Sequence, residues 1–316
     1  MKKKIFAVML TVAMVSLLLV GCGGDKAPAK EEKDGYVIGV AMNTQTNPFF
    51  VTVVDGCKKA AEEAGAELIV TDAQDDPTTQ QKDIENLITK QPDAIIIDPC
   101  DSDGIVSSVE ACNEAGIPVL TMDRESNGGE VLAHIGYDAI KSGKLAGQFL
   151  ADELDGKGKI VELQGILAAN VAQDRSKGFN EVMKENPDME VVACQSADFN
   201  RDKGMKTMET ILKGHPEIDG LYAANDEMLL GALEAIETAG RLDEITVIGC
   251  DCLDETKDAI RDGKVEGTIA EPPFFLGKAM IENAIKYLDG EEIDDRIILE
   301  NQLVTKDNVD KVKTEE

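Results

Sequence analysis

The chain has 316 residues, of which 61 are acidic and 32 are basic, so its formal net charge at pH 7 is −29. This charge excludes nucleic acid as a partner, because phosphate backbones bind through clustered lysine and arginine side chains. It also disfavours an anionic solute, although a local basic pocket could still hold one. The length suits two domains of ordinary size.

The N-terminus has the pattern of an export signal: lysines at positions 2 to 4, then an apolar stretch from Ile5 to Val20. Residues 19–22, "LVGC", resemble the bacterial lipobox. This resemblance implies cleavage before Cys22 and a diacylglycerol group on its sulfur. The alternative is an ordinary signal peptide followed by an incidental cysteine. We expect residues 1–21 to be removed and Cys22 to anchor the protein outside the cytoplasmic membrane.

Residues 22–35 predict a flexible tether, because they offer no large apolar side chain whose burial would offset the entropy of ordering. From Tyr36 onward, short apolar runs alternate with helical patterns, which predicts βαβ units in parallel sheets. Strands are expected at residues 36–42, 67–70, 93–98, 117–123, 131–138, 159–165, 190–195, 220–225, 245–251 and 264–271. Helices are expected at residues 48–64, 77–90, 102–115, 139–154, 174–185, 201–213, 226–239, 254–261 and 275–288. The repeated half-units favour two doubly wound α/β lobes over one wide sheet.

Polar residues follow the ends of most expected strands. In open α/β sheets, ligands bind outside the carboxyl ends of the strands, so these residues describe the rim of a candidate binding site. Some of them, such as Asn225, Asp226 and Asp251, are also explained as helix caps. The rim consists of Asn43, Thr44, Asp98, Asp123, Arg124, Gln164, Asn225, Asp226, Asp251 and Glu271.

No sequence pattern indicates catalysis or a cofactor. No expected strand leads into a glycine-rich nucleotide fingerprint or a phosphate-binding loop. The two histidines, His134 and His215, do not complete a metal site or a nucleophilic triad. Cys250 and Cys252 suggest a metal site, but no second close pair completes a ligand set, and most of the six cysteines after Cys22 are interpreted as small buried apolar residues. We therefore expect no enzyme activity, no cofactor and no bound metal.

The segment "TNPFF" at residues 46–50 places two phenylalanines in the first turn of an expected helix. Asn47 suits the N-cap and Pro48 suits the first helical position. Phe49 and Phe50 can then face a cleft beyond the strand end. The alternative is a pair of core phenylalanines that anchor the start of the helix.

Seven segments resemble, in order, the ribose-type periplasmic binding proteins, which are substrate receptors of sugar ABC transporters. The resemblance extends from about residue 36 to residue 304 and implies two α/β lobes joined by a hinge of three crossovers, with a sugar bound between them. It places residues 36–137 and 271–300 in the N-terminal lobe, and residues 138–270 and 301–316 in the C-terminal lobe. The segments are "NPFF" (47–50), "MDRES" (122–126), "ELQG" (162–165), "RSKGF" (175–179), "ADFNR" (197–201), "AANDEMLLGALEA" (223–235) and "DGKVEGTIAE" (262–271).

The resemblance also assigns the sugar contacts. A sugar ring has apolar faces and a belt of hydroxyl groups, so it suits aromatic rings above and below and charged groups at its edge. Phe50 and Phe199 are expected to sandwich the ring, while Asp123 and Arg124, otherwise a surface ion pair, bind its hydroxyl groups. The expected contacts are Asn47, Phe49, Phe50, Asp123, Arg124, Arg175, Phe199, Asn225, Asp251 and Glu271.

Two departures from the family pattern bear on the identity of the ligand. Ribose receptors usually have glutamine where Glu271 stands, and their "FDG" is "CDC" at residues 250–252. An ionised Glu271 only accepts hydrogen bonds, which favours a hexose, a polyol or an inositol. Ribose remains our first choice, because the other expected contacts agree with it.

We expect an extracytoplasmic, lipid-anchored monomer that closes around a monosaccharide by a population shift and delivers it to an ABC permease and its ATPase. One alternative is a sugar receptor for a sensor kinase or chemoreceptor. Another is a glycosidase that uses two carboxylates, such as Asp123 and Glu271. A third is a regulator similar to the lac-repressor-type proteins, which would need a helix-turn-helix where this chain has an export signal.

Overall fold

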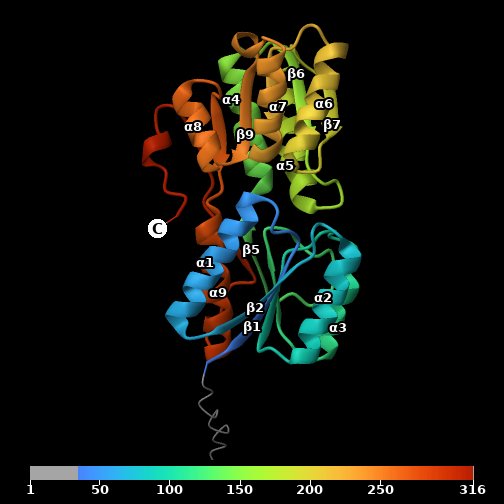
Figure 1. Ribbon diagram of the computed structural model, residues 1–316, viewed down its shortest axis with the longest axis vertical. Helices are drawn as coiled ribbons and strands as arrows, with labels where there is room; N and C mark the ends of the chain where they lie inside the picture. The colour runs from blue at the N-terminus through green and yellow to red at the C-terminus, as the bar shows by residue number, and fades with distance from the viewer. Residues whose placement is uncertain (1–34, 316) are drawn as a thin grey trace, which may run out of the picture. The chain divides into compact units, whose positions relative to one another are not determined.

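Two six-stranded sheets, each with helices on both faces, are built from the residues that the computed structural model describes, 35–315 (Figure 1). The predicted signal peptide, Cys22 and nearly all of the predicted tether lie outside the described residues. None of the described helices is both long and apolar enough to cross a membrane. The prediction of two doubly wound α/β lobes is confirmed.

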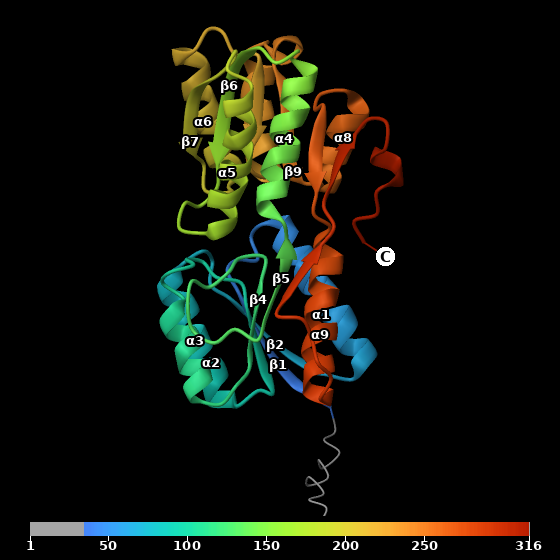
Figure 2. The ribbon, with the colours of Figure 1, turned by 180° about the vertical axis from the view of Figure 1, so that it is seen from behind.

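The first sheet and its helices form what we call the N-terminal lobe. Its strands are β1 (Val37–Met42), β2 (Glu67–Asp72), β3 (Ala94–Ile97), β4 (Val119–Met122), β5 (Ala133–Tyr137) and β11 (Arg296–Leu299). They lie in the order β11-β5-β4-β3-β1-β2, and every neighbouring pair is parallel. Helices α1 (Pro48–Ala64) and α9 (Pro273–Asp289) cover one face, and α2 (Pro77–Lys90) and α3 (Val106–Glu114) cover the other (Figures 1 and 2).

The second sheet and its helices form the C-terminal lobe. Its strands are β6 (Gly158–Gln164), β7 (Met189–Ser196), β8 (Gly220–Ala223), β9 (Thr246–Asp251), β10 (Gly267–Ala270) and β12 (Gln302–Thr305). Its helices are α4 (Ala139–Glu153), α5 (Asn170–Glu185), α6 (Arg201–Gly214), α7 (Asp226–Thr238) and α8 (Asp254–Asp262), with the short 3-10 helices η1 (Leu242–Glu244) and η2 (Val309–Lys311). The strand order is β12-β10-β9-β8-β6-β7, and the edge strand β12 runs antiparallel to β10.

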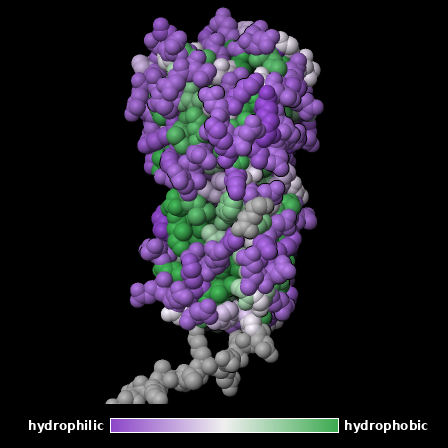
Figure 3. Space-filling model, turned by 90° about the vertical axis from the view of Figure 1, so that its left-hand side faces the viewer, coloured by the Kyte–Doolittle hydropathy of each residue, from purple (hydrophilic) through white to green (hydrophobic). Residues whose placement is uncertain are grey.

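The central strands are buried on both faces because helices cover both sides of each sheet. Strand β3, for example, is a run of alanine and three isoleucines that are all fully buried. The six cysteines among residues 35–315 form no disulfide bond, and all except Cys194 are buried. Hydrophilic side chains dominate the face shown in Figure 3, as the high content of acidic residues requires.

Within the described residues the chain passes between the lobes from β5 to α4, from β10 to α9, and from β11 to β12. Hydrogen bonds join these three crossovers to one another. Asn301 Nδ2 donates to the carbonyl oxygen of Asp138 at 2.9 Å and to Ser142 Oγ at 2.6 Å. Tyr137 Oη donates to the carbonyl oxygen of Pro272 at 2.8 Å. The hinge is therefore a hydrogen-bonded unit of three adjacent segments.

Asp226, at the start of α7, gives the fold a dependence on pH. Its buried carboxylate accepts hydrogen bonds from Thr268 Oγ1 at 2.8 Å and from the amide of Leu253 at 2.9 Å, and burial raises its pKa to about 7. A carboxyl group whose pKa rises on folding stabilises the fold below its unfolded pKa, and this contribution is lost as pH rises through the folded pKa. We expect Asp226→Asn to weaken the fall in unfolding free energy between about pH 4 and pH 7.

Urea unfolding at a series of pH values measures this effect. Asparagine can keep both hydrogen bonds because the hydroxyl group of Thr268 can donate or accept. Asp243→Asn, at an exposed position, is the matched control and should leave the pH profile of the wild type unchanged. A profile for Asp226→Asn that is as steep as that of the wild type would contradict the prediction.

Candidate functional site

The carboxyl ends of the two sheets face each other across a small cavity. Residues of the N-terminal lobe reach it from the start of α1 and from the end of β4, and residues of the C-terminal lobe reach it from α5 and from the ends of β7, β8 and β9. Its lining consists of Asn47, Phe49, Phe50, Asp123, Arg124, Val171, Arg175, Phe199, Asn225 and Asp251. The structure thus brings together every expected contact except Glu271, which lies behind Arg175.

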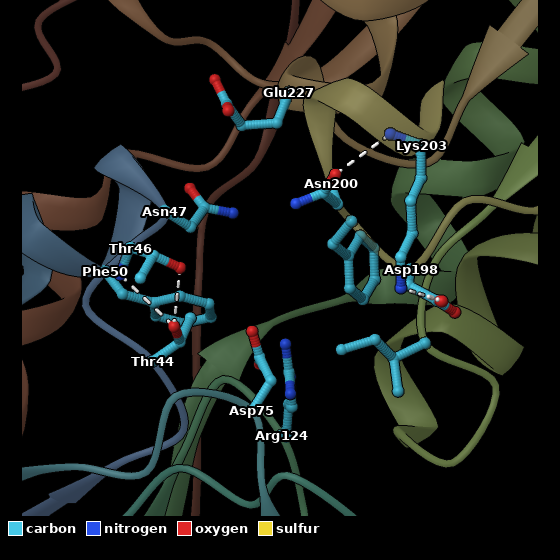
Figure 4. Close-up of a pocket in the computed structure, with 12 residues that line it drawn as sticks. Thr44, Thr46, Asn47, Phe50, Asp75, Arg124, Asp198, Asn200, Lys203 and Glu227 are labelled. Atoms are coloured by element: carbon cyan, nitrogen blue, oxygen red, sulfur yellow. Dashed lines mark hydrogen bonds and ion pairs between the residues drawn. The ribbon is translucent and has the colours of Figure 1, made fainter. Parts of the chain in front are cut away.

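A larger cavity of about 330 Å³ adjoins the small one and shares Asn47, Phe50, Arg124 and Phe199 with it. Figure 4 shows Asn47 and Phe50 on one side of this hollow and Asn200 and Lys203 on the other. Of its remaining lining residues, only Thr44 belongs to the strand-end rim that the sequence predicts. The others are Thr46, Asp75, Ile166, Asp198, Asn200, Lys203 and Glu227.

Aromatic rings from the two lobes flank the guanidinium group of Arg124. Its Cζ atom lies 5.5 Å from the ring centroid of Phe50 and 5.6 Å from that of Phe199. Phe49 packs edge-on against Phe50 with the ring centroids 5.2 Å apart. A cation near two ring faces is attracted by their quadrupoles. The arrangement offers a ligand one flat apolar surface from each lobe and a fixed group of donors beside them.

Several of these side chains are held by backbone in the left-handed region. The φ angles of Asp123, Phe199 and Asp251 are 55°, 56° and 120°. Such conformations are costly for residues other than glycine, and they cluster at active sites and ligand-binding sites. Gly165 lies directly against Phe199, since a Cβ atom at this glycine would be 2.0 Å from Cζ of the ring. The position of the ring therefore depends on the absence of a side chain at Gly165.

Arg175 forms the centre of the ion-pair network in the C-terminal lobe. Its Nη2 atom donates to Glu271 Oε2 at 2.5 Å and lies 3.6 Å from Asp251 Oδ1, while Nη1 donates to the carbonyl oxygen of Ala224 at 2.7 Å. The second oxygen of Glu271 accepts from Ser142 Oγ at 2.5 Å, within the hinge. Glu271 therefore positions Arg175 and connects it to the hinge.

Arg124 has an unusual partner in the N-terminal lobe. Asp98, at the end of β3, is completely buried, and its Oδ1 atom lies 4.0 Å from Arg124 Nε. Neither oxygen of Asp98 has a hydrogen-bond partner, and neither does Arg124 Nε, whereas Arg124 Nη1 donates to the carbonyl oxygen of Pro99 at 3.2 Å. Asp98 thus places a buried carboxyl group behind the guanidinium group, whose outer nitrogen, Nη2, is available for a ligand.

Burial raises the pKa of two carboxyl groups that line the small cavity. The pKa of Asp251 lies well above its ordinary value because of burial, although the charge of Arg175 lowers it in part. Burial also raises the pKa of Asp123, against the effect of Arg175 and Arg124. A carboxyl group that takes up a proton becomes a donor as well as an acceptor. The acidic side chains can therefore match hydroxyl groups, which themselves both donate and accept.

Two expected contacts also act as helix caps, which the sequence predicts for Asn47 and offers as the alternative interpretation for Asn225. Asn47 Oδ1 accepts from the amide of Phe49 at 2.9 Å at the start of α1. Asn225 Oδ1 accepts from the amide of Met228 at 3.0 Å at the start of α7. In each case the cap uses the amide oxygen. The cap therefore fixes the side-chain amide at the edge of the cavity.

Among residues 35–315, one group of potential metal ligands lies at the site: Cys250, Asp251 and Glu271, whose ligand atoms are all within 4.8 Å of one another. The guanidinium group of Arg175 already contacts both carboxylates. A cation would have to displace this positive charge, so the group is explained by the ion pair.

Comparison with known proteins identifies the family. The family model of the periplasmic binding protein domain matches residues 38–292. The chain belongs to the periplasmic binding proteins. The ribose import binding protein of Bacillus subtilis is 38% identical to it over 300 residues, which cover 93% of this chain and 96% of that protein. The predictions of the family, and of a binding protein rather than an enzyme, are confirmed.

Solved structures of ABC transporter solute-binding proteins have the same fold. The protein of Bacillus halodurans with bound myo-inositol has a TM-score of 0.84 and 33% identity, covering 89% of this chain and 98% of that one. The protein of Actinobacillus succinogenes with bound D-allose has a TM-score of 0.83 and 28% identity, covering 88% of this chain and all of that one. Periplasmic binding proteins of this fold thus hold ligands as different as a cyclic polyol and a hexose.

Proposed function

We propose that this protein binds a neutral monosaccharide or a related polyol in the cavity between its lobes and delivers it unchanged to an ABC importer. One observation carries the proposal: Phe50 and Phe199, on opposite lobes, present their rings beside the buried charged groups of Arg124, Asp123 and Arg175. Stacking against the C–H faces and charge-assisted bonds to the hydroxyl groups are the two interactions that a sugar ring needs. The sugar and polyol ligands of its relatives support this class of ligand.

The proposal extends to the contacts and to the lobes. Nine of the ten predicted residues contact the ligand at the small cavity, and the tenth, Glu271, acts through Arg175. The N-terminal lobe comprises residues 36–137 and 271–300, and the C-terminal lobe comprises residues 138–270 and 301–316. The distribution of the strands between the two sheets supports these bounds.

The protein acts outside the cytoplasmic membrane as a monomer, attached by lipid at Cys22. The lipobox-like sequence before this cysteine supports the anchor. Ribose is the first choice among the ligands, and a hexose, an inositol or another polyol is the alternative that the acidic Glu271 favours. A sensor kinase or chemoreceptor as the partner would use the same binding site.

A thermal-shift screen against pentoses, hexoses, inositols and linear polyols tests the proposal. We expect at least one compound to raise the melting temperature in proportion to the logarithm of its concentration. Phe50→Ala should reduce the affinity for that compound at least about tenfold, because loss of a stacking ring costs more than 1 kcal/mol.

Val51→Ala is the matched control, because Val51 is exposed and is the next residue of α1. The variant Val51→Ala should bind the compound with the affinity of the wild type. The proposed site would be refuted if no compound of the panel raised the melting temperature, or if Phe50→Ala bound the compound as tightly as the wild type.

A further inference from the structure

Helix α5 lacks an N-cap side chain in its own sequence. The residue at its N-cap is Ala169, which has no polar atom in its side chain, and the helix begins at Asn170. Serine, threonine, aspartate and asparagine are the usual residues here, because a side-chain oxygen accepts a hydrogen bond from a free amide of the first turn. In this protein the oxygen comes from the other lobe: Ser102 Oγ accepts from the amide of Asn170 at 3.1 Å.

Further hydrogen bonds connect the same two segments across the cleft. The amide of Ser102 donates to the carbonyl oxygen of Ala168 at 3.0 Å, and Ser102 Oγ lies 3.4 Å from Asn170 Oδ1. The amide of Glu125, which follows the candidate ligand contact Arg124, donates to Asn170 Oδ1 at 2.9 Å. The side chain of Ser102 is buried. Two loops of the N-terminal lobe therefore hold the start of one helix of the C-terminal lobe.

The residues that form these bonds line neither cavity of the candidate site: Ser102, Ala168 and Asn170. Helix α5 nevertheless carries Val171 and Arg175, which line the small cavity. The bonds across the cleft thus fix the helix that presents Arg175, and they do so from outside the two cavities. If the lobes separate, the amide of Asn170 loses its protein acceptor and becomes accessible to solvent.

We propose that Ser102 and Asn170 form a latch, a helix cap supplied across the cleft, which holds the lobes closed and thereby sets the affinity for every ligand. The latch rests on the proposed function, because it acts on binding between the lobes. The apparent dissociation constant equals the intrinsic constant divided by the fraction of protein in the competent state. A weaker latch lowers the fraction of protein in the competent state, so the apparent affinity for every ligand falls by the same factor. Ser102 and Asn170 are therefore positioning residues.

The test compares Ser102→Ala with Ser107→Ala, since Ser107 is an exposed serine in the nearby helix α3. Titration calorimetry and stopped-flow dissociation use two probes, ribose and myo-inositol. In Ser102→Ala, we expect both affinities to fall by one common factor, about three- to thirty-fold, mainly through faster dissociation. Ser107→Ala should behave as the wild type, and Ser102→Thr, which keeps the hydroxyl group, should restore most of the affinity. Unchanged constants, or factors that differ between the probes, would overturn the latch.

Amide hydrogen exchange of the unliganded protein gives a readout that does not depend on the identity of the ligand. We expect the first-turn amides of α5 to exchange faster in Ser102→Ala than in Ser107→Ala, with the rest of the helix unaffected. Equal exchange in the two variants would overturn the latch. If neither the probes nor any other sugar binds to the wild type, the proposed function fails, whereas this exchange measurement still decides whether the latch exists.

Discussion

Replacing Arg175 with methionine is expected to abolish ligand binding and to lower the free energy of unfolding by about 3–5 kcal/mol, the usual cost of breaking a buried ion pair. The guanidinium group is buried among Asp251, Glu271 and Asp123. Asp123 belongs to the opposite lobe, and Glu271 lies in the crossover between β10 and α9. Methionine fills much of the volume but leaves Asp251 and Glu271 without the positive charge of their partner. Urea unfolding and titration calorimetry measure the two effects separately.

A second substitution distinguishes the two roles of Arg175. In the double variant Arg175→Met with Glu271→Gln, the neutral amide can still accept the hydrogen bond from Ser142 and no longer leaves an unpaired charge. We expect the double variant to regain part of the lost stability but none of the lost binding. A double variant no more stable than the single one would show that Glu271 is not the main partner of Arg175. Binding by either variant at wild-type strength would exclude Arg175 as a ligand contact.

The sequence predicts a helix accurately where its signals are local. The expected bounds of α1 and α2 agree with the structure, since each begins with a capping side chain, Asn47 or Asp76, followed by proline. Helix α3 begins at Val106 rather than at residue 102, because Asp101 Oδ1 accepts from the amides of Asp103 and Gly104 and holds this segment in a turn. Local side-chain bonds of this kind compete with the helix.

Features that depend on the opposite lobe could not be predicted in this way. Helix α5 begins four residues before the expected residue 174, because the cap that stabilises its start is Ser102. Strands β11 and β12 were not expected at all. They are short, partly exposed edge strands whose partners are distant in sequence, and the antiparallel direction of β12 follows from the crossover that precedes it.

The candidate site, too, could be predicted only in part from the sequence. Strand-end positions predict four of the residues that meet at the small cavity, since all strand ends of a parallel sheet lie at one edge. These are Asp123, Arg124, Asn225 and Asp251. Arg175 and Phe199 were expected only from the family resemblance. Strand-end positions could not show that Asp98 lies behind Arg124, or that Glu271 faces Arg175 and the hinge rather than the cavity. Lys203 and Glu227 were missed because, in the sequence, they resemble ordinary charged residues in the first turn of a surface helix.

Arg124→Ala should reduce the affinity for the best ligand of the screen about 100-fold, because it removes two or more charge-assisted hydrogen bonds. It should also make the stability depend more strongly on pH. Burial raises the pKa of Asp98 well above its ordinary value, and the positive charge of Arg124 lowers it in part. Without Arg124 the pKa of Asp98 rises further, so that ionising this buried carboxyl group costs more free energy.

The sign of the pH effect follows from linkage. Below its unfolded pKa, Asp98 is protonated in both the folded and the unfolded protein. In this pH range its titration therefore contributes nothing to the difference in unfolding free energy between the variant and the wild type. As pH rises, the unfolded chain releases the proton first, so each protein loses stability up to its own folded pKa, which is higher in the variant. The destabilisation by Arg124→Ala should therefore grow in urea unfolding once pH rises above the folded pKa of Asp98 in the wild type, which lies well above its ordinary value. When Arg124→Ala is made in the Asp98→Asn variant, most of this increase in destabilisation with pH should disappear. If the destabilisation by Arg124→Ala instead became smaller as pH rises, Asp98 would not be the group whose pKa responds to Arg124.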